Sequence, residues 1–118
     1  MEELIKISDD SPTEKSLKPE NENSVEGITF DVLINHPYKY TEIEFFKEVH
    51  FNRRGKKHLK LETYSLKRLG LAKRYGWGVH IDADKKIAIV PCESEQYNNL
   101  LTDPKVKKSN AYRNKKKS

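Results

Sequence analysis

The residues best suited to chemistry are the cations between positions 53 and 74. This stretch holds nine Lys or Arg and a single acid, Glu62. Tyr64, Tyr75 and Trp77 lie within it or directly after it. Lysine and arginine neutralise phosphates, and aromatic rings stack on unpaired bases. The pattern predicts a surface for nucleic acid or another polyanion, and the binding residues that we expect are Arg53, Arg54, Lys56, Lys57, Arg68, Lys73 and Arg74.

An ordinary solvated surface is the alternative interpretation of these charges. Residues 1–48 carry 5 Lys or Arg against 12 Asp or Glu, whereas residues 49–118 carry 18 against 6. The two halves could neutralise each other across the fold, and such charge also serves solubility. The basic half could equally dock an acidic protein. The charge pattern therefore leaves nucleic acid and an acidic protein open as partners.

A second candidate site lies in the stretch Tyr75-Gly-Trp-Gly-Val-His-Ile81. Alternate residues of a strand face opposite sides, so Gly76, Gly78 and His80 would share one face and Trp77 and Val79 the other. Glycines in a strand indicate either a closely packed neighbouring segment or a shallow floor for a ligand. In the second case the chain would be a small ligand-binding protein or an enzyme that uses this face.

Signatures of catalysis are weak. The four histidines, at positions 36, 50, 58 and 80, show no metal-ligand spacing, and we expect neither a metal nor another cofactor. His50 is interpreted as a surface residue near the end of a helix. Cys92 could be a nucleophile with His80 across a hairpin, but a lone cysteine after a strand is more often inert. These observations favour a binding protein over an enzyme.

A small α+β fold must position these residues. Helices are predicted at 24–36, at 41–54 and, as a short one, after Ser94. Ser24 caps the first. The second begins with the capping box Thr41-Glu42-Ile43-Glu44 and ends before Gly55. The predicted strands are 4–7, 58–64, 75–81 and 87–90, the last two forming a hairpin. We therefore expect a small antiparallel sheet of about four strands, with two to three helices packed on one face.

The length of 118 residues fits one domain. We expect that domain to span residues 1–104, with a polar loop at 8–23, and to be followed by a partly disordered basic tail at 105–118.

The longest aliphatic run, Ile87–Val90, is too short to cross a bilayer, so no membrane partner is expected. The acidic first residues lack the features of a secretion signal, and one cysteine fits a reducing compartment. Both features favour the cytoplasm.

Four segments of the chain carry a resemblance to a known family. They are His36-Pro-Tyr-Lys-Tyr-Thr41, Lys73-Arg-Tyr-Gly-Trp-Gly-Val-His80, Lys86-Ile-Ala-Ile89 and Glu93-Ser-Glu-Gln-Tyr97. Together they resemble a bacterial family described only as domain of unknown function 6157, from about Leu4 to Arg113. Asp10-Ser11-Pro12 stands where the family has Asp-Cys-Pro, and residues 55–66 are shorter and more basic than its pattern. The resemblance implies a bacterial protein of one domain and implies no activity.

Overall fold

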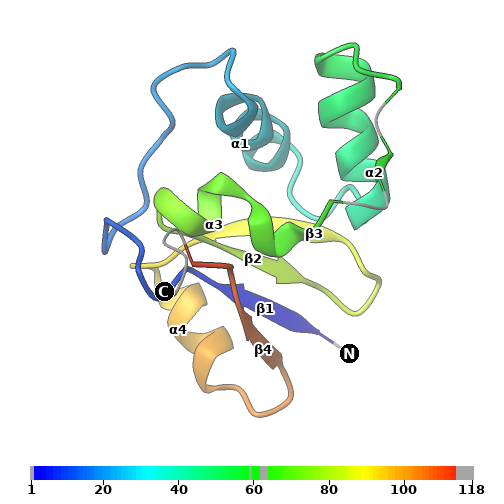
Figure 1. Ribbon diagram of the computed structural model, residues 1–118. Coiled ribbons are helices and arrows are strands. Elements are labelled where there is room, and N and C mark those ends of the chain that lie inside the picture. Colours follow the sequence, from blue (N-terminus) through cyan, green and yellow to red (C-terminus); the bar gives the residue numbers. More distant parts are fainter. Residues whose placement is uncertain (1, 59, 62–63, 114–118) are drawn as a thin grey trace.

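A four-stranded sheet lies at the centre of the fold (Figure 1). The computed structural model describes residues 2–58, 60–61 and 64–113. The strands are β1 (Glu3–Lys6), β2 (Trp77–Ile81), β3 (Ile87–Pro91) and β4 (Lys107–Asn110), in the order β3-β2-β1-β4. β2 is antiparallel to β1 and β3, whereas β1 and β4 run parallel. The expected α+β fold is confirmed, with one parallel pair in a sheet expected to be antiparallel.

The hairpin of β2 and β3 follows the predicted alternation. Val79 pairs with Ile89 in the antiparallel register, and both side chains are buried. Trp77 is 8% exposed, its indole Nε1–H donates to the carbonyl of Leu17 at 2.9 Å, and its ring meets Phe30 edge-on at 5.3 Å. The predicted hairpin, with Trp77 and Val79 on one face, is therefore confirmed, and both side chains are buried.

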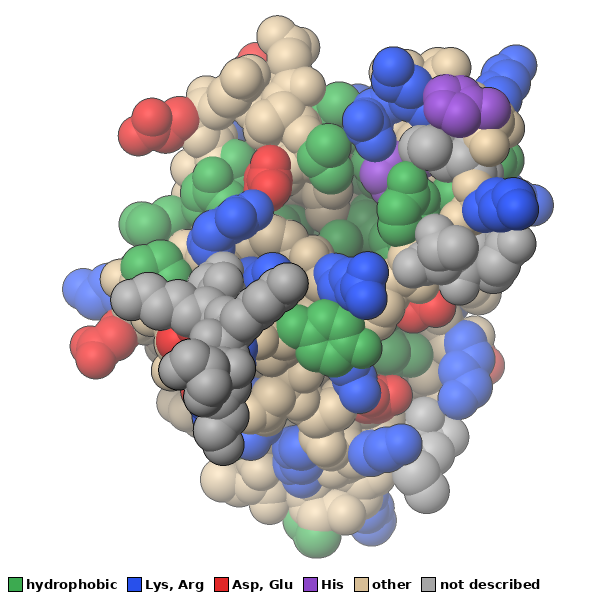
Figure 2. Space-filling view, viewed as in Figure 1, with side chains coloured by type: hydrophobic (Ala, Val, Ile, Leu, Met, Phe, Trp, Pro, Cys, Tyr) green, Lys and Arg blue, Asp and Glu red, His purple; other side chains and the backbone are tan. Residues whose placement is uncertain are grey.

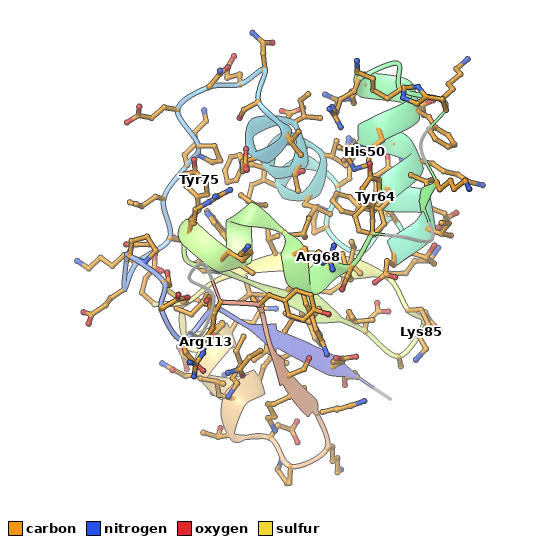
Figure 3. The ribbon with its side chains drawn as sticks, in the orientation of Figure 1. His50, Tyr64, Arg68, Tyr75, Lys85 and Arg113 are labelled. Carbon is orange, nitrogen blue, oxygen red and sulfur yellow. The ribbon has the colours of Figure 1, made fainter. Side chains whose placement is uncertain are left out.

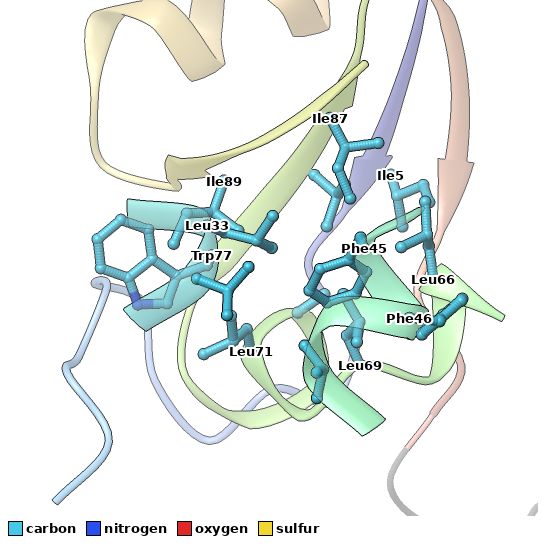
Figure 4. Close-up of a cluster of buried hydrophobic side chains, with 14 of the residues drawn as sticks. Ile5, Leu33, Phe45, Phe46, Leu66, Leu69, Leu71, Trp77, Ile87 and Ile89 are labelled. Atoms are coloured by element: carbon cyan, nitrogen blue, oxygen red, sulfur yellow. The ribbon is translucent and has the colours of Figure 1, made fainter. Parts of the chain in front are cut away.

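Helices of the first half and middle of the chain cover one face of the sheet (Figure 1). They are α1 (Val25–Asn35), α2 (Glu42–Phe46), the π-helical η1 (Lys47–Arg53), the 3₁₀ turn η3 (Leu66–Arg68) and α3 (Gly70–Arg74). Ser24 caps α1 by accepting from the Gly27 N–H, as predicted. Figure 4 shows their side chains meeting Ile5, Ile87 and Ile89 of the sheet. This apolar contact forms the main core.

The predicted helix 41–54 consists of two parts, α2 and η1. Its capping box is present: Thr41 accepts from the Glu44 N–H, and the Glu44 carboxylate accepts from the Thr41 N–H at 2.9 Å. Gly55 has a φ of +67°, the left-handed conformation expected after the helix end. The buried stripe starts at Phe45 and Phe46 and continues one turn later. Ile43 lies beside that stripe and is exposed.

The opposite face of the sheet is covered by α4 (Glu95–Thr102), which Ser94 caps. Its Tyr97 packs with Leu4, Val90 and Val106 in a second, smaller core. The helix expected after Ser94 therefore forms but does not lie with the other helices. Residues 107–110, expected in a basic tail, form β4 and complete the sheet beside β1.

The strand predicted at 58–64 is wrong for the residues that the structure describes. Positions 58, 60, 61 and 64 form no strand, and positions 59, 62 and 63 lie outside the described residues. Other segments occupy the free edges of β1 and β3, where a further strand could have paired. β4 pairs with β1, and residues 38–41 border β3 through backbone hydrogen bonds of Tyr38 and Tyr40 with Ile87. The alternation of Leu61 with its polar neighbours instead reflects burial of Leu61 in the main core.

Candidate nucleic-acid interface

A pocket of about 290 Å³ opens between α1 and the segment from η1 to α3. Figure 2 shows this region as a hollow with a largely hydrophobic floor and several Lys or Arg side chains near its rim. The lining residues are Val25, Glu26 and Thr29 from α1, Phe46 and His50 from α2 and η1, and Tyr64, Ser65, Arg68, Leu69, Gly70, Leu71 and Arg74 from the middle of the chain. We call it the aromatic pocket.

Three rings form one wall of the aromatic pocket. His50 and Tyr64 have centroids 4.5 Å apart, and Phe46 lies 5.5 Å from Tyr64. Figure 3 shows His50 and Tyr64 next to each other, with Arg68 on the side toward the sheet. Phe46 and His50 are buried four residues apart in sequence, so the helix presents them on the same side. The result is an aromatic wall at the edge of the core, in which Phe46 and His50 are buried and Tyr64 is partly exposed.

His50 is a buried hydrogen-bonding residue of this wall, with 6% of its surface exposed. Its Nδ1 lies 2.7 Å from a guanidinium nitrogen of Arg54. Since a guanidinium can only donate, Nδ1 accepts and the neutral ring carries its proton on Nε2. Burial, together with the charge of Arg54, lowers the pKa of His50 below its usual value. Its Nε2–H has no hydrogen-bond partner in the described part of the chain.

Two arginines from successive helical turns stand at the mouth of the aromatic pocket. Arg68 ends η3 and lies over the ring of Tyr112, 5.6 Å from its centroid. Arg74 ends α3 and forms an ion pair with Glu26 of α1 at 2.9 Å. Gly70 allows α1 and α3 to approach, because a Cβ there would lie 2.6 Å from Cγ of Glu26. The mouth therefore contains two guanidinium groups and one carboxylate, and the carboxylate is paired with Arg74.

The remaining expected cations have different surroundings. Arg53 is held by two acids, Asp31 at 2.9 Å and Glu48 at 3.2 Å. Arg54 is hydrogen-bonded to His50, and Lys73 is half-buried. Lys56 and Lys57 are exposed just after the turn at Gly55. The structure thus brings Arg68 and Arg74 to the pocket, bonds Arg54 to His50 of its wall, leaves two lysines exposed and engages Arg53 in ion pairs.

Gly76, Gly78 and His80 of the second candidate site are each covered by protein. A Cβ on Gly78 would lie 2.5 Å from Cε2 of Tyr97, and one on Gly76 would lie 2.4 Å from the carbonyl oxygen of Lys15. His80 is 7% exposed and bonds both of its ring nitrogens to protein groups, Tyr38 and Glu2. These contacts correspond to the close-packing interpretation of the two glycines.

Sequence reasoning missed the buried position of His50. It was expected at the surface, yet it lies four residues after the buried Phe46, and that helical spacing was the available signal. Tyr64 was expected near the cations and does line the pocket. Trp77, which was considered with it, belongs to the core. Only a fold that brings α1, η1 and η3 together creates the pocket, and that arrangement is not visible in local patterns.

Across residues 2–58, 60–61 and 64–113, no three or more His, Cys, Asp or Glu side chains gather as a metal site would require. In the same ranges, every helix is too short or too polar to cross a bilayer.

Comparison with known proteins places the chain in a family. No curated protein and no solved structure matches it. A family model described as "Family of unknown function (DUF6157)" matches residues 1–117, nearly the whole sequence. This match agrees with the resemblance carried by the segments around Tyr38, Trp77 and Tyr97. The protein therefore belongs to the DUF6157 family.

Proposed function

We propose that this protein is a non-enzymatic binding module that contacts single-stranded nucleic acid through the face around the aromatic pocket. The observation that carries the proposal is the pairing of an aromatic wall with two arginines at its mouth. Guanidinium groups bind phosphate oxygens, and ring faces stack on unpaired bases. A duplex, whose bases are already stacked, would use only the cations.

Lys56 and Lys57 extend the cationic surface beyond the pocket. Both are exposed and follow the end of η1, the helix that also contributes His50. With Arg68 and Arg74 they make four cations available to a phosphate backbone. Arg74 is already paired with Glu26, but an exposed ion pair is worth little and exchanges partners at small cost. A strand of several nucleotides therefore has both charge and stacking surface to follow.

Salt dependence of binding tests the proposal. A fluorescently labelled single strand should bind at low salt, and four phosphate contacts predict a log–log slope of roughly −2.8 for affinity against salt concentration. The double variant Arg68→Gln/Arg74→Gln should bind more weakly and flatten that slope. The control Lys39→Gln/Lys85→Gln removes the same charge from two exposed positions outside the pocket lining and should bind much more like the wild type.

A second variant tests the role of the acidic half of the chain. Because Glu26 competes with phosphate for Arg74, Glu26→Gln should bind the single strand more tightly than the wild type. If neither the wild type nor Glu26→Gln binds the single strand at low salt, the nucleic-acid proposal is rejected. If the two double variants weaken binding equally, the face around the aromatic pocket is not the binding site, and only a diffuse effect of net charge remains.

A further inference from the structure

We infer that the aromatic pocket receives one unstacked base of the bound strand while Arg68 and Arg74 hold the adjacent phosphates. This inference rests on the proposed function and adds to it a defined site for a single heterocycle. Charge alone would let the strand lie anywhere on the basic face. The pocket instead predicts that one nucleotide is turned inward and separated from its neighbours.

The size of the pocket favours a single ring system. Its volume of about 290 Å³ lies just below the usual range for small-molecule sites. Its walls include the packed rings of Phe46, His50 and Tyr64 and the aliphatic side chains of Val25 and Leu71. Phe46 and His50 are buried, whereas Tyr64 is partly exposed, so Tyr64 is the ring on which a flat heterocycle would stack. Base–aromatic stacking tolerates every base because each has a π-face.

The polar groups of the lining suit the edge of a base. His50 carries an Nε2–H that no described residue accepts, and the ring is more than nine-tenths buried. Burying a donor is costly where no acceptor meets it, so a ligand acceptor that reaches this N–H, which has no partner among the described residues, gains affinity. The Ser65 hydroxyl accepts from the Lys67 N–H and retains its own proton to donate. The pocket therefore offers donors to carbonyl or ring-nitrogen acceptors, which all four bases carry.

The mouth of the pocket distinguishes a nucleotide from a purely apolar occupant. A lipid chain or an apolar side chain of another protein would fill the aromatic wall but would not use Arg68 and Arg74. Both arginines line the same opening as the rings, so one ligand can contact all of them. A planar base attached to a negatively charged backbone is the chemistry that fits both parts at once.

An abasic strand separates the base pocket from the basic surface. The probe is a labelled DNA oligomer of about ten nucleotides, compared with one of equal length whose sugars lack bases. The wild type should bind the base-containing strand roughly 5- to 150-fold more tightly, the range expected from stacking one base. Tyr64→Leu should remove most of this preference and leave affinity for the abasic strand unchanged. Because that abasic affinity depends on the folded surface, it also reports whether the variant folds.

Tyr112→Leu is the matched control. Tyr112 lies under Arg68 on the same face but is 47% exposed and is not part of the pocket lining. Loss of the base preference in this variant rather than in Tyr64→Leu would place stacking on the open surface and overturn the inference. Equal binding of the two strands by the wild type would also overturn it and leave the proposed function standing. Binding of neither strand would reject both.

Discussion

The hydroxyl of Tyr38 lies 2.7 Å from Nδ1 of His80, on the sheet face opposite to the aromatic pocket. The other ring nitrogen lies 2.7 Å from a carboxylate oxygen of Glu2, and the Gln96 side chain donates to the Tyr38 oxygen at 3.1 Å. One assignment satisfies all four groups: His80 donates from Nε2 to Glu2 and accepts at Nδ1 from Tyr38. The chain of hydrogen bonds joins Glu2, directly before β1, to β2, α4 and the segment after α1.

Removing the Tyr38 hydroxyl should destabilise the fold. Tyr38→Phe leaves Nδ1 of the buried His80 without its donor, which should lower the free energy of unfolding by about 1–3 kcal/mol. Urea denaturation followed by Trp77 fluorescence measures the change. Tyr40→Phe is the control, because the Tyr40 hydroxyl bonds to none of the described residues, and its effect should be small. Equal effects of the two substitutions would contradict the network.

The contact between Gly78 and Tyr97 predicts a second loss of stability. A methyl group at position 78 would overlap the Tyr97 ring, so Gly78→Ala should cost about 1–3 kcal/mol of folding free energy. Tyr97→Leu removes the ring atoms that the methyl group meets. In the double variant the cost of Gly78→Ala should therefore be smaller than in the wild-type background. Additive costs would show that the ring is not what excludes the side chain.

The environment of His50 predicts a loss of stability in mild acid. Burial and Arg54 lower the pKa of His50 in the folded protein, whereas the unfolded chain has the ordinary value of about 6.5. As pH falls below that value, the unfolded chain takes up a proton that the folded protein resists, so the free energy of unfolding decreases. The loss continues down to the lowered pKa of the folded state.

His50→Gln isolates this contribution from those of the other histidines. Glutamine can still accept from Arg54 but has no proton to gain in this pH range. The free energy of unfolding should therefore decrease less between pH 7.5 and pH 5.5 in the variant than in the wild type, as measured by urea titrations at both values. Identical pH dependence in the two proteins would contradict a neutral, buried His50.

Cys92 should react slowly with thiol reagents at neutral pH. Burial, with Glu93 adding to it, raises the pKa of the thiol, and its Sγ lies 3.1 Å from the carbonyl oxygen of Glu14. Since the thiolate is the reactive form, labelling with a chromogenic disulfide should be much slower in the folded protein than in denaturant. Cys92→Ser should bind nucleic acid as the wild type does. Fast labelling of the folded protein would contradict a raised pKa of the Cys92 thiol.

Local patterns in the sequence predicted the elements whose partners are near in the chain. The alternation around Trp77 and the capping box at Thr41 each involve a few consecutive residues, and both are confirmed. β4 could not be recognised in the same way. Lys107-Lys108-Ser109-Asn110 has no apolar alternation, because this edge strand is joined to β1 through backbone hydrogen bonds and buries little side-chain surface.

In the candidate site, too, only local features could be predicted from the sequence. Charge density identified Arg68 and Arg74, since clustering of cations is visible in sequence. The pocket itself depends on segments that are not adjacent in sequence: Glu26 reaches Arg74 across 48 positions, and the ring of His50 meets that of Tyr64. The ion pairs of Arg53 were equally hidden, because Asp31 lies 22 positions away. Side chains of this kind acquire their roles only from tertiary packing.

The parallel pairing of β1 with β4 has a consequence for biosynthesis. Glu3 and Ser109, hydrogen-bonded across this pair, are 106 positions apart. At 5–20 residues per second, a ribosome needs roughly 5–20 s to travel between them. Until β2 is translated, both backbone edges of β1 are open, and from then until β4 is made β1 can pair with β2 along one side only. One edge of β1 therefore stays open to neighbouring chains for the whole interval. Translation beyond β4 closes this edge with a strand that begins Lys107-Lys108, and charged lysines on an outer strand discourage further strand addition.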